Sequence, residues 1–157
     1  MLEDDGFVSV GRVTLQPPAR LVIHFNRDDA RAWGPALYAF RVGGEVVRLG
    51  KCESTLRGRM IETERLVSRA LAGNFQKGGT NPWEAFEWRR RLTEHQYGEL
   101  LAREGPTTEE RVLIRRYDPP LCNDSPCARL RPPEARGVRG EDRVALAIAY
   151  WQRLNQS

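Results

Sequence analysis

The sequence predicts a single mixed α/β domain, and three observations support this class. The chain has 157 residues, a length typical of one compact domain with its own core. Short runs rich in β-branched residues dominate the first third, and a Gly-Gly pair separates two of them. Farther along, apolar residues recur at helical spacing behind residues that cap helices. We therefore expect strands first, helices after them, and no boundary between domains within residues 1–157.

The first 35 residues predict a β-rich extension. Phe7–Val10, Val13–Leu15 and Arg20–Phe25 are short apolar runs, and a Pro-Pro pair interrupts them after the second run. A turn-prone NRDD stretch ends the third run. We expect extra strands here, ahead of the main body of the domain.

Residues 37–51, LYAFRVGGEVVRLGK, predict a β-hairpin closed by the Gly-Gly pair, which supplies the positive φ that a two-residue turn needs. If the turn alone sets the register, Tyr38 pairs with Leu49. Lys51 then lies on the same face as Tyr38, and Arg48 points to the other face. A shift of the pairing by one residue would reverse these faces.

The Gly-Lys ending of the hairpin does not predict a nucleotide-binding P-loop. A Walker A loop has four residues between its glycines and a serine or threonine after the lysine. Here five residues separate Gly44 from Gly50, and Cys52 follows Lys51. The intervening EVVRL is apolar and β-branched, which suits a strand.

Three later segments read as helices. Ser54-Thr55 can cap a helix over Leu56–Ala72, whose apolar residues form one stripe. Glu94–Arg103 and Thr107–Tyr117 are two more helical segments, which Gly105-Pro106 separates.

Residues 83–92 are ambiguous. The alternation of Phe86, Trp88 and Leu92 favours a strand, whereas Asn81-Pro82 followed by Glu84 resembles a helix start. We favour a strand. Residues 125–157 predict an irregular segment rich in arginine and proline, up to Gly140, followed by an amphipathic helix over Glu141–Leu154.

The charge balance suits a polyanionic partner. Lysine and arginine number 25 against 21 acidic residues, a net charge of +4, and only Lys51 and Lys77 are lysines, which leaves 23 arginines. Planar guanidinium groups bind phosphates with two hydrogen bonds, so this usage fits nucleic acid. A GC-rich coding sequence explains the same usage equally well.

No membrane association is expected. The sequence contains no apolar run long enough to span a bilayer, and the acidic start MLEDDGF lacks the layout of a signal peptide. A soluble cytoplasmic protein is the expectation.

The hairpin and the segment after it resemble the GIY-YIG nuclease superfamily. The two motif strands would be Leu37-Tyr38-Ala39 and Arg48-Leu49-Gly50, and the helix arginine of the family would be Arg59. A second string, ERVLIRRYDPPLCN from Glu110 to Asn123, is similar to the other signature of the family, which the GIY-YIG domain of excinuclease C also carries. Two motifs in the right order make the resemblance specific.

The resemblance implies a core over residues 36–124: a small three-stranded antiparallel sheet flanked by helices. It also favours a strand near Phe86. The extension over residues 1–35 and the segment over residues 125–157, with its C-terminal helix, fall outside the match. Stand-alone restriction-type members of the family lack a separate DNA-reading domain, as this sequence does.

The resemblance also implies site residues. Tyr38 would orient or deprotonate the attacking water, Arg59 would neutralise charge on the phosphate, and Glu110 would bind one divalent cation such as Mg²⁺. Asn123 would support the site through hydrogen bonds. On the same-face register, Lys51 would stabilise a Tyr38 phenolate or bind the phosphate.

Each role has a structural alternative. Tyr38 can be a half-buried strand aromatic, and Lys51 a solvated charge at a strand end. Arg57 competes with Arg59, and Thr107-x-x-Glu110 can be a helix capping box, with Glu109 as the second candidate for the metal.

Two residues depart from the family pattern. Asn123 can be a turn residue and lies one position later than in the excinuclease pattern. Arg48 stands where the second motif has a tyrosine.

These observations predict a metal-dependent endonuclease that hydrolyses DNA phosphodiester bonds in restriction or defence. Cleavage of both strands by so small a site would favour a homodimer. The alternative is a non-catalytic nucleic-acid-binding module with a degenerate site, which Arg48 suggests. The candidate phosphate contacts are Arg48, Arg57, Arg89, Arg90, Arg115 and Arg116.

Overall fold

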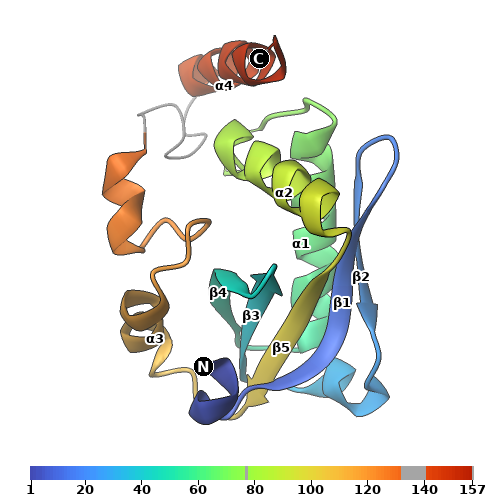
Figure 1. Cartoon of the computed structure of the whole chain (residues 1–157), viewed down its shortest axis with the longest axis vertical. Coiled ribbons are helices and arrows are strands. Elements are labelled where there is room, and N and C mark those ends of the chain that lie inside the picture. The colour runs from blue at the N-terminus through green and yellow to red at the C-terminus, as the bar shows by residue number, and fades with distance from the viewer. Residues whose placement is uncertain (77, 132–140, 157) are drawn as a thin grey trace.

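A computed structural model describes residues 1–76, 78–131 and 141–156, with the side chains of 141–143 excepted. Five antiparallel strands form one sheet in the order β2-β1-β5-β3-β4. Figure 1 shows this sheet with helices on both of its faces. The strands are β1 (Val8–Gln16), β2 (Arg20–Phe25), β3 (Ala36–Val42), β4 (Glu45–Cys52) and β5 (Gly98–Glu104).

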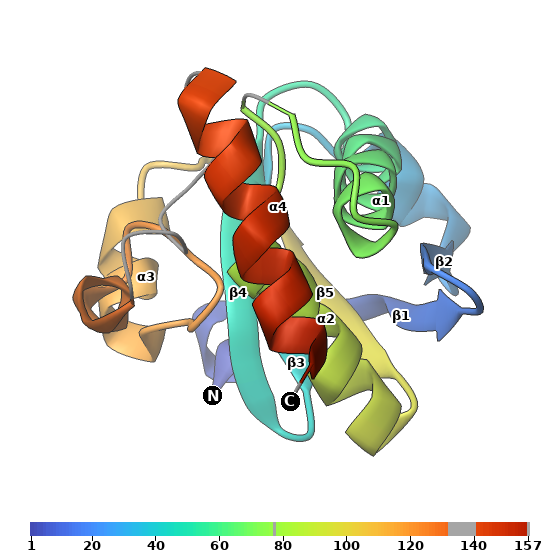
Figure 2. The same cartoon turned by 90° about the horizontal axis from the view of Figure 1, so that it is seen from above.

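Helices pack on both faces of the sheet: α3 lies against β4 on one face, and α1 lies mainly against β2 on the other. In Figure 2, α1 and α3 stand on opposite sides of β3 and β4, and α4 crosses over α2. The α-helices are α1 (Leu56–Leu71), α2 (Pro82–His95), α3 (Glu110–Tyr117) and α4 (Glu141–Gln156). Short 3-10 helices are η1 (Leu2–Asp5), η2 (Asp28–Ala32) and η3 (Pro126–Leu130).

The mixed α/β class is confirmed, but the sheet has five strands, not three. The three-stranded expectation covers β5, β3 and β4 only. The extension over residues 1–35 supplies β1 and β2, which join the same sheet because β1 pairs with β5. The irregular segment predicted up to Gly140 includes η3, and its part over residues 132–140 lies outside the described residues.

The strand predicted at residues 83–92 is wrong, because these residues lie in α2. The Asn81 side chain caps this helix by accepting a hydrogen bond from the backbone N–H of Glu84 at 2.8 Å, and Pro82 occupies the first turn. Ala85, Trp88 and Leu92 are buried at helical spacing. The helix start at Asn81 therefore decides the structure of this segment, and the apparent alternation of apolar residues does not.

The helix predicted over Glu94–Arg103 is also wrong. Residues 98–104 form β5, which lies between β1 and β3. Leu100, Leu101 and Ala102 are all fully buried, because both faces of a central strand are covered. Burial on both faces removes the alternation that would have marked a strand in the sequence.

Two apolar cores cover the two faces of the sheet. The larger core contains Tyr38 and Phe40 together with Met60 of α1 and Trp88 of α2. The smaller core contains Leu37 and Ala39, on the opposite face, with apolar residues of α3 and of the first seven residues. Each strand of the hairpin therefore directs alternate side chains to different helices.

The hairpin turn is confirmed, but its register is not the predicted one. Gly43 and Gly44 both have positive φ, as a two-residue turn requires. A β-bulge then shifts the pairing between Phe40 and Arg41 of β3, so that Phe40 pairs with Arg48 and Val47 of β4 is the extra residue. Tyr38 consequently pairs with Gly50, not with Leu49.

The observed register exchanges the two cations of β4. Lys51 pairs with Leu37, on the face that α3 covers, whereas Arg48 shares the face of Tyr38. The expected placement of Tyr38 and Lys51 on one face is therefore wrong. A single inserted residue has this effect because side chains alternate with a period of two along a strand.

The N-terminal residues fasten α3 to the sheet. The Asp5 carboxylate accepts hydrogen bonds from the Tyr117 hydroxyl at 2.5 Å and from Arg116 Nη1 at 2.6 Å. Leu2 and Phe7 are buried in the smaller core beside Leu113 of α3. This N-terminal segment fixes the position of the helix that begins with Glu110.

None of the helices formed by the described residues has both the length and the apolar character needed to cross a membrane.

We predict that Asp5→Asn loosens α3 and lowers the Tm at neutral pH. The Tyr117 hydroxyl and Arg116 hold the pKa of the Asp5 carboxyl below its ordinary value. The stabilisation is therefore complete above that ordinary value and is lost as the pH falls through the folded-state pKa. Thermal unfolding over a pH series should show a deficit at neutral pH that closes in strong acid. A deficit of the same size at every pH would contradict this account.

Candidate active site

Tyr38 lies on the inner face of the hairpin with its hydroxyl over Gly50. Its side chain is 3% exposed, and its ring packs edge-on against Phe40 at 6.0 Å between centroids. A Cβ atom at Gly50 would lie 2.6 Å from the Tyr38 hydroxyl oxygen, so only glycine leaves room for the phenol here. The space that the Tyr38 hydroxyl needs therefore explains why the second motif has a glycine at position 50.

Two arginines act on the Tyr38 hydroxyl. Burial raises the pKa of this phenol above its ordinary value, and the positive charges of Arg48 and Arg59 oppose that rise. Arg48 comes from β4, and Arg59 from the first turn of α1. The buried phenol thus has cationic neighbours on two different elements.

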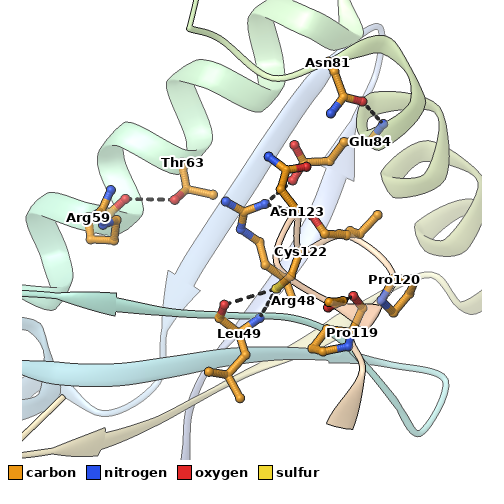
Figure 3. A network of polar contacts seen from close by, with 12 residues as sticks. Arg48, Leu49, Arg59, Thr63, Asn81, Glu84, Pro119, Pro120, Cys122 and Asn123 are labelled. Atoms are coloured by element: carbon orange, nitrogen blue, oxygen red, sulfur yellow. Dashed lines mark hydrogen bonds and ion pairs between the residues drawn. The ribbon is translucent and has the colours of Figure 1, made fainter. Parts of the chain in front are cut away.

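Arg48 is held in place by α2 and by the loop that follows α3. Its Nη1 atom forms a hydrogen-bonded ion pair with Oε1 of Glu84 and lies 3.4 Å from the carbonyl oxygen of Leu121. In Figure 3 the Arg48 side chain extends from β4 toward Glu84. The attraction of Glu84 raises the pKa of Arg48.

Lys51 and Glu110 lie on the other side of the β4 edge. Lys51 Nζ is 3.6 Å from Oε1 of Glu53, and its charge also acts on the carboxylate of Glu110. Arg59 acts on Glu110 as well as on Tyr38. The positive charge of Arg59 therefore acts on both titratable groups of the candidate site, the Tyr38 phenol and the Glu110 carboxyl.

Glu110 is a half-buried carboxyl at the start of α3. Burial raises its pKa above the ordinary value, and the nearby Asp124 and Glu53 act in the same direction. Lys51 and Arg59 oppose them. Several groups of both signs thus meet at this carboxyl, which is not a solvated surface charge.

The capping-box alternative for Glu110 is wrong. The N-cap residue of α3 is Glu109, and it makes no side-chain capping hydrogen bond. The Thr107 hydroxyl donates instead to Glu53 at 3.1 Å, so it does not cap the helix. Glu110 is left without the structural task that the sequence pattern offered.

Glu110 is the carboxylate that the sequence suggests for a divalent cation. Within residues 1–76, 78–131 and 141–156, no group of three or more His, Cys, Asp or Glu side chains could hold a metal ion. Mg²⁺ nevertheless binds through one or two carboxylates and completes its shell with water and substrate phosphate. A carboxyl whose pKa is raised by burial and by acidic neighbours gains from a nearby cation.

Asn123 belongs to a loop that is fastened to β4. The Cys122 thiol exchanges hydrogen bonds with the backbone N–H and C=O of Leu49, both at 3.2 Å, and the Leu121 N–H donates to the Val47 carbonyl at 2.9 Å. Asn123 itself is exposed, and its Oδ1 accepts from Arg131 Nη1 at 3.1 Å. Figure 3 shows Asn123 near the Arg48 side chain and Glu84.

The remaining candidate arginines do not gather at one surface. Arg89 bonds to Asn155 of α4, and Arg90 pairs with Glu87 at 2.7 Å within its own helix. Arg116 pairs with Asp5, and exposed Arg57 lines a surface pocket near η2.

Arg115 lines a cavity of about 530 Å³ together with Asn123, Asp124, Arg129 and Arg131. Of the predicted phosphate contacts, Arg48 and Arg115 lie nearest the candidate site.

Sequence reasoning missed Glu84 and Arg131. Glu84 is a charged residue in the apolar stripe of α2, next to Ala85, and this signal is visible only once the segment is assigned as a helix. Arg131 is 7% exposed, stacks over Trp83 at 4.3 Å and donates to the carbonyl oxygens of the loop. No local pattern in the sequence marks it.

No protein-family model matches this sequence, and no curated protein matches it. Among solved structures, the chain is similar to "Restriction endonuclease HPY188I in complex with product DNA", with a TM-score of 0.47 and 9% sequence identity. The alignment covers 66% of this chain and 58% of that one, which is less than two thirds of its length. A likeness of this size carries no inference about activity.

We predict that Glu110→Gln raises the Tm at neutral pH when no divalent cation is present. The folded state disfavours the ionised carboxylate, so the wild type loses stability as the pH rises through the raised pKa of Glu110. Differential scanning calorimetry should show equal Tm values in acid and a more stable variant at neutral pH. Mg²⁺ should then raise the Tm of the wild type more than that of the variant. A lower Tm for Glu110→Gln at neutral pH would indicate a structural ion pair instead.

Proposed function

We propose that this protein is a metal-dependent endonuclease of the GIY-YIG type that hydrolyses DNA phosphodiester bonds. The observation that supports the proposal is that the positive charge of Arg59 opposes the raised pKa both of the buried phenol of Tyr38 and of the half-buried carboxyl of Glu110. Phosphodiester hydrolysis can use these three groups: a phenol that would activate water, a carboxylate that would bind a metal ion, and an arginine whose charge acts on both.

The chain's own residues would divide the chemistry between them. Tyr38, as phenolate, would take a proton from the attacking water, and the water oxygen would form the new bond to phosphorus. The bond from phosphorus to the leaving oxygen then breaks, and that oxygen takes a proton from solvent. Arg59 would neutralise the charge that builds on the phosphate oxygens during this exchange.

Glu110 would hold the cation, with water and substrate oxygens as the other ligands. A bound Mg²⁺ would supply charge stabilisation at the phosphate and at the leaving oxygen. Lys51, on the Glu110 side of β4, suits a contact with the phosphate and not the stabilisation of a Tyr38 phenolate. Asn123 would support the loop at the rim through its bond to Arg131.

Restriction or defence is the role that we favour. Target selection would then involve residues around the site itself. Arg115, which lines the cavity beside Asn123, suits a phosphate that flanks the scissile bond. Cutting both strands would need two copies of the site, and therefore a homodimer on the DNA.

A plasmid-nicking assay with and without Mg²⁺ tests this function. The wild type should convert supercoiled plasmid to the nicked form only with the cation. Glu110→Gln should cut at least about 100-fold more slowly, since a lost metal contact removes several kcal/mol of transition-state stabilisation.

Glu109→Gln is the matched control for this experiment. Glu109 precedes Glu110 and is the second candidate for the metal, but its carboxylate accepts a hydrogen bond from Arg103 at 3.1 Å, so this variant removes the same charge one residue away. It should cut like the wild type. If wild type, Glu110→Gln and Glu109→Gln all bind DNA and none cuts it, the protein is a non-catalytic binding module.

A further inference from the structure

The proposed chemistry gives no role to Glu84, yet this residue is in direct contact with Arg48. Its side chain is 9% exposed, although carboxylates are rarely buried without a partner. It lies in the first turn of α2, where the Asn81 cap fixes the backbone. The cap therefore fixes the backbone of Glu84, and the ion pair with Arg48 engages its carboxylate.

Arg48 reaches this carboxylate only because of the bulge at Val47. The extra residue turns Arg48 to the face where α2 packs. This is also the face of Tyr38, whose hydroxyl lies over Gly50, two residues farther along β4. The Leu121 carbonyl oxygen, 3.4 Å away, holds the guanidinium from the loop side. Arg48 is thus held between Glu84, the loop and Tyr38.

The groups around Tyr38 come from four elements, and their effects differ in sign. Arg48 of β4 and Arg59 of α1 stabilise a phenolate, whereas Cys122 of the loop acts against it. Glu84 of α2 acts through Arg48, whose charge it partly neutralises. The net effect on Tyr38 therefore depends on how strongly Glu84 competes with the phenol for the guanidinium.

We propose that Glu84 is a positioning residue of the site: it holds the Arg48 guanidinium beside the Tyr38 hydroxyl and limits the positive charge that the phenol receives. This inference rests on the proposed nuclease function. It assigns the ion pair of Glu84 and Arg48 to the place where the second motif of the family has a tyrosine. Removal of Arg48 and removal of Glu84 then have opposite effects on Tyr38.

Ultraviolet titration of the tyrosines tests this proposal without any substrate. The difference between the wild type and Tyr38→Phe isolates the ionisation of Tyr38, and the same difference is then measured in the Arg48→Gln and Glu84→Gln backgrounds. Arg48→Gln should raise the titration midpoint of Tyr38 by about one pH unit, a tenfold change in phenolate. Glu84→Gln should lower it, because the glutamine side-chain oxygen can still accept from Arg48 and hold it in place, whereas the negative charge that competes with the phenol is gone.

Arg41→Gln is the matched control. Arg41 is also an ion-paired arginine of the hairpin, bound to Glu3 at 2.9 Å and to Glu99 at 3.3 Å, but it pairs with Val46 on the opposite face. This variant should leave the Tyr38 midpoint unchanged. A midpoint that moves equally in Arg41→Gln and Arg48→Gln would mean general loosening of the hairpin and would overturn the proposal.

The pH profile of cleavage links the titration to the reaction. The acidic limb of kcat should move up in Arg48→Gln and down in Glu84→Gln, as the Tyr38 midpoint does. An unmoved or raised midpoint in Glu84→Gln overturns the role of Glu84, even if cutting still depends on Glu110. If Arg48→Gln does not fold, the test uses Glu84→Gln together with Arg48→Lys. Arg48→Lys keeps the positive charge, so its Tyr38 midpoint should equal that of the wild type. If the wild type does not cut DNA at all, the proposed nuclease function is overturned instead.

Discussion

The extra residue of β4, Val47, decides which side chains meet in this protein. It shifts the pairing of β4 against β3, so that Arg48 lies with Tyr38 and Lys51 lies with Leu37. Its own carbonyl is not left without a partner, because the Leu121 N–H donates to it at 2.9 Å. The bulge and the loop after α3 therefore stabilise each other, and the two halves of the candidate site depend on both.

Because β4 is an edge strand, side chains from both faces of the sheet can contribute to one site beside it. Helix α3 packs against β4 on one face, and α1 lies on the opposite face of the sheet, mainly against β2, so Arg59 and Glu110 come from helices on opposite faces. The N-terminal segment anchors α3 through Asp5, and the Cys122 thiol anchors the following loop to Leu49. Elements far apart in the sequence thus hold the candidate catalytic groups, and within the described residues the outer edge of β4 has no neighbouring strand.

Local signals in the sequence were sufficient where local chemistry decides the structure. The Gly-Gly turn and the Thr55 cap of α1 were predictable, because a positive φ and a capping oxygen act within a few residues. The register was not, because the partner of Val47 is Leu121, far along the chain. Strand β5 was taken for a helix because burial on both faces removes its alternation. Glu84 was missed for the related reason that α2 was assigned as a strand.

The register of β3 against β4 carries this account, and hydrogen-bond couplings between the two strands, measured by nuclear magnetic resonance, test it most directly. We predict that Tyr38 is paired with Gly50 and Leu37 with Lys51, with Val47 outside the ladder and in contact with Leu121. Pairing of Tyr38 with Leu49 and of Phe40 with Val47 would contradict the account. It would place Lys51 beside the phenol and separate Arg48 from both Tyr38 and Glu84.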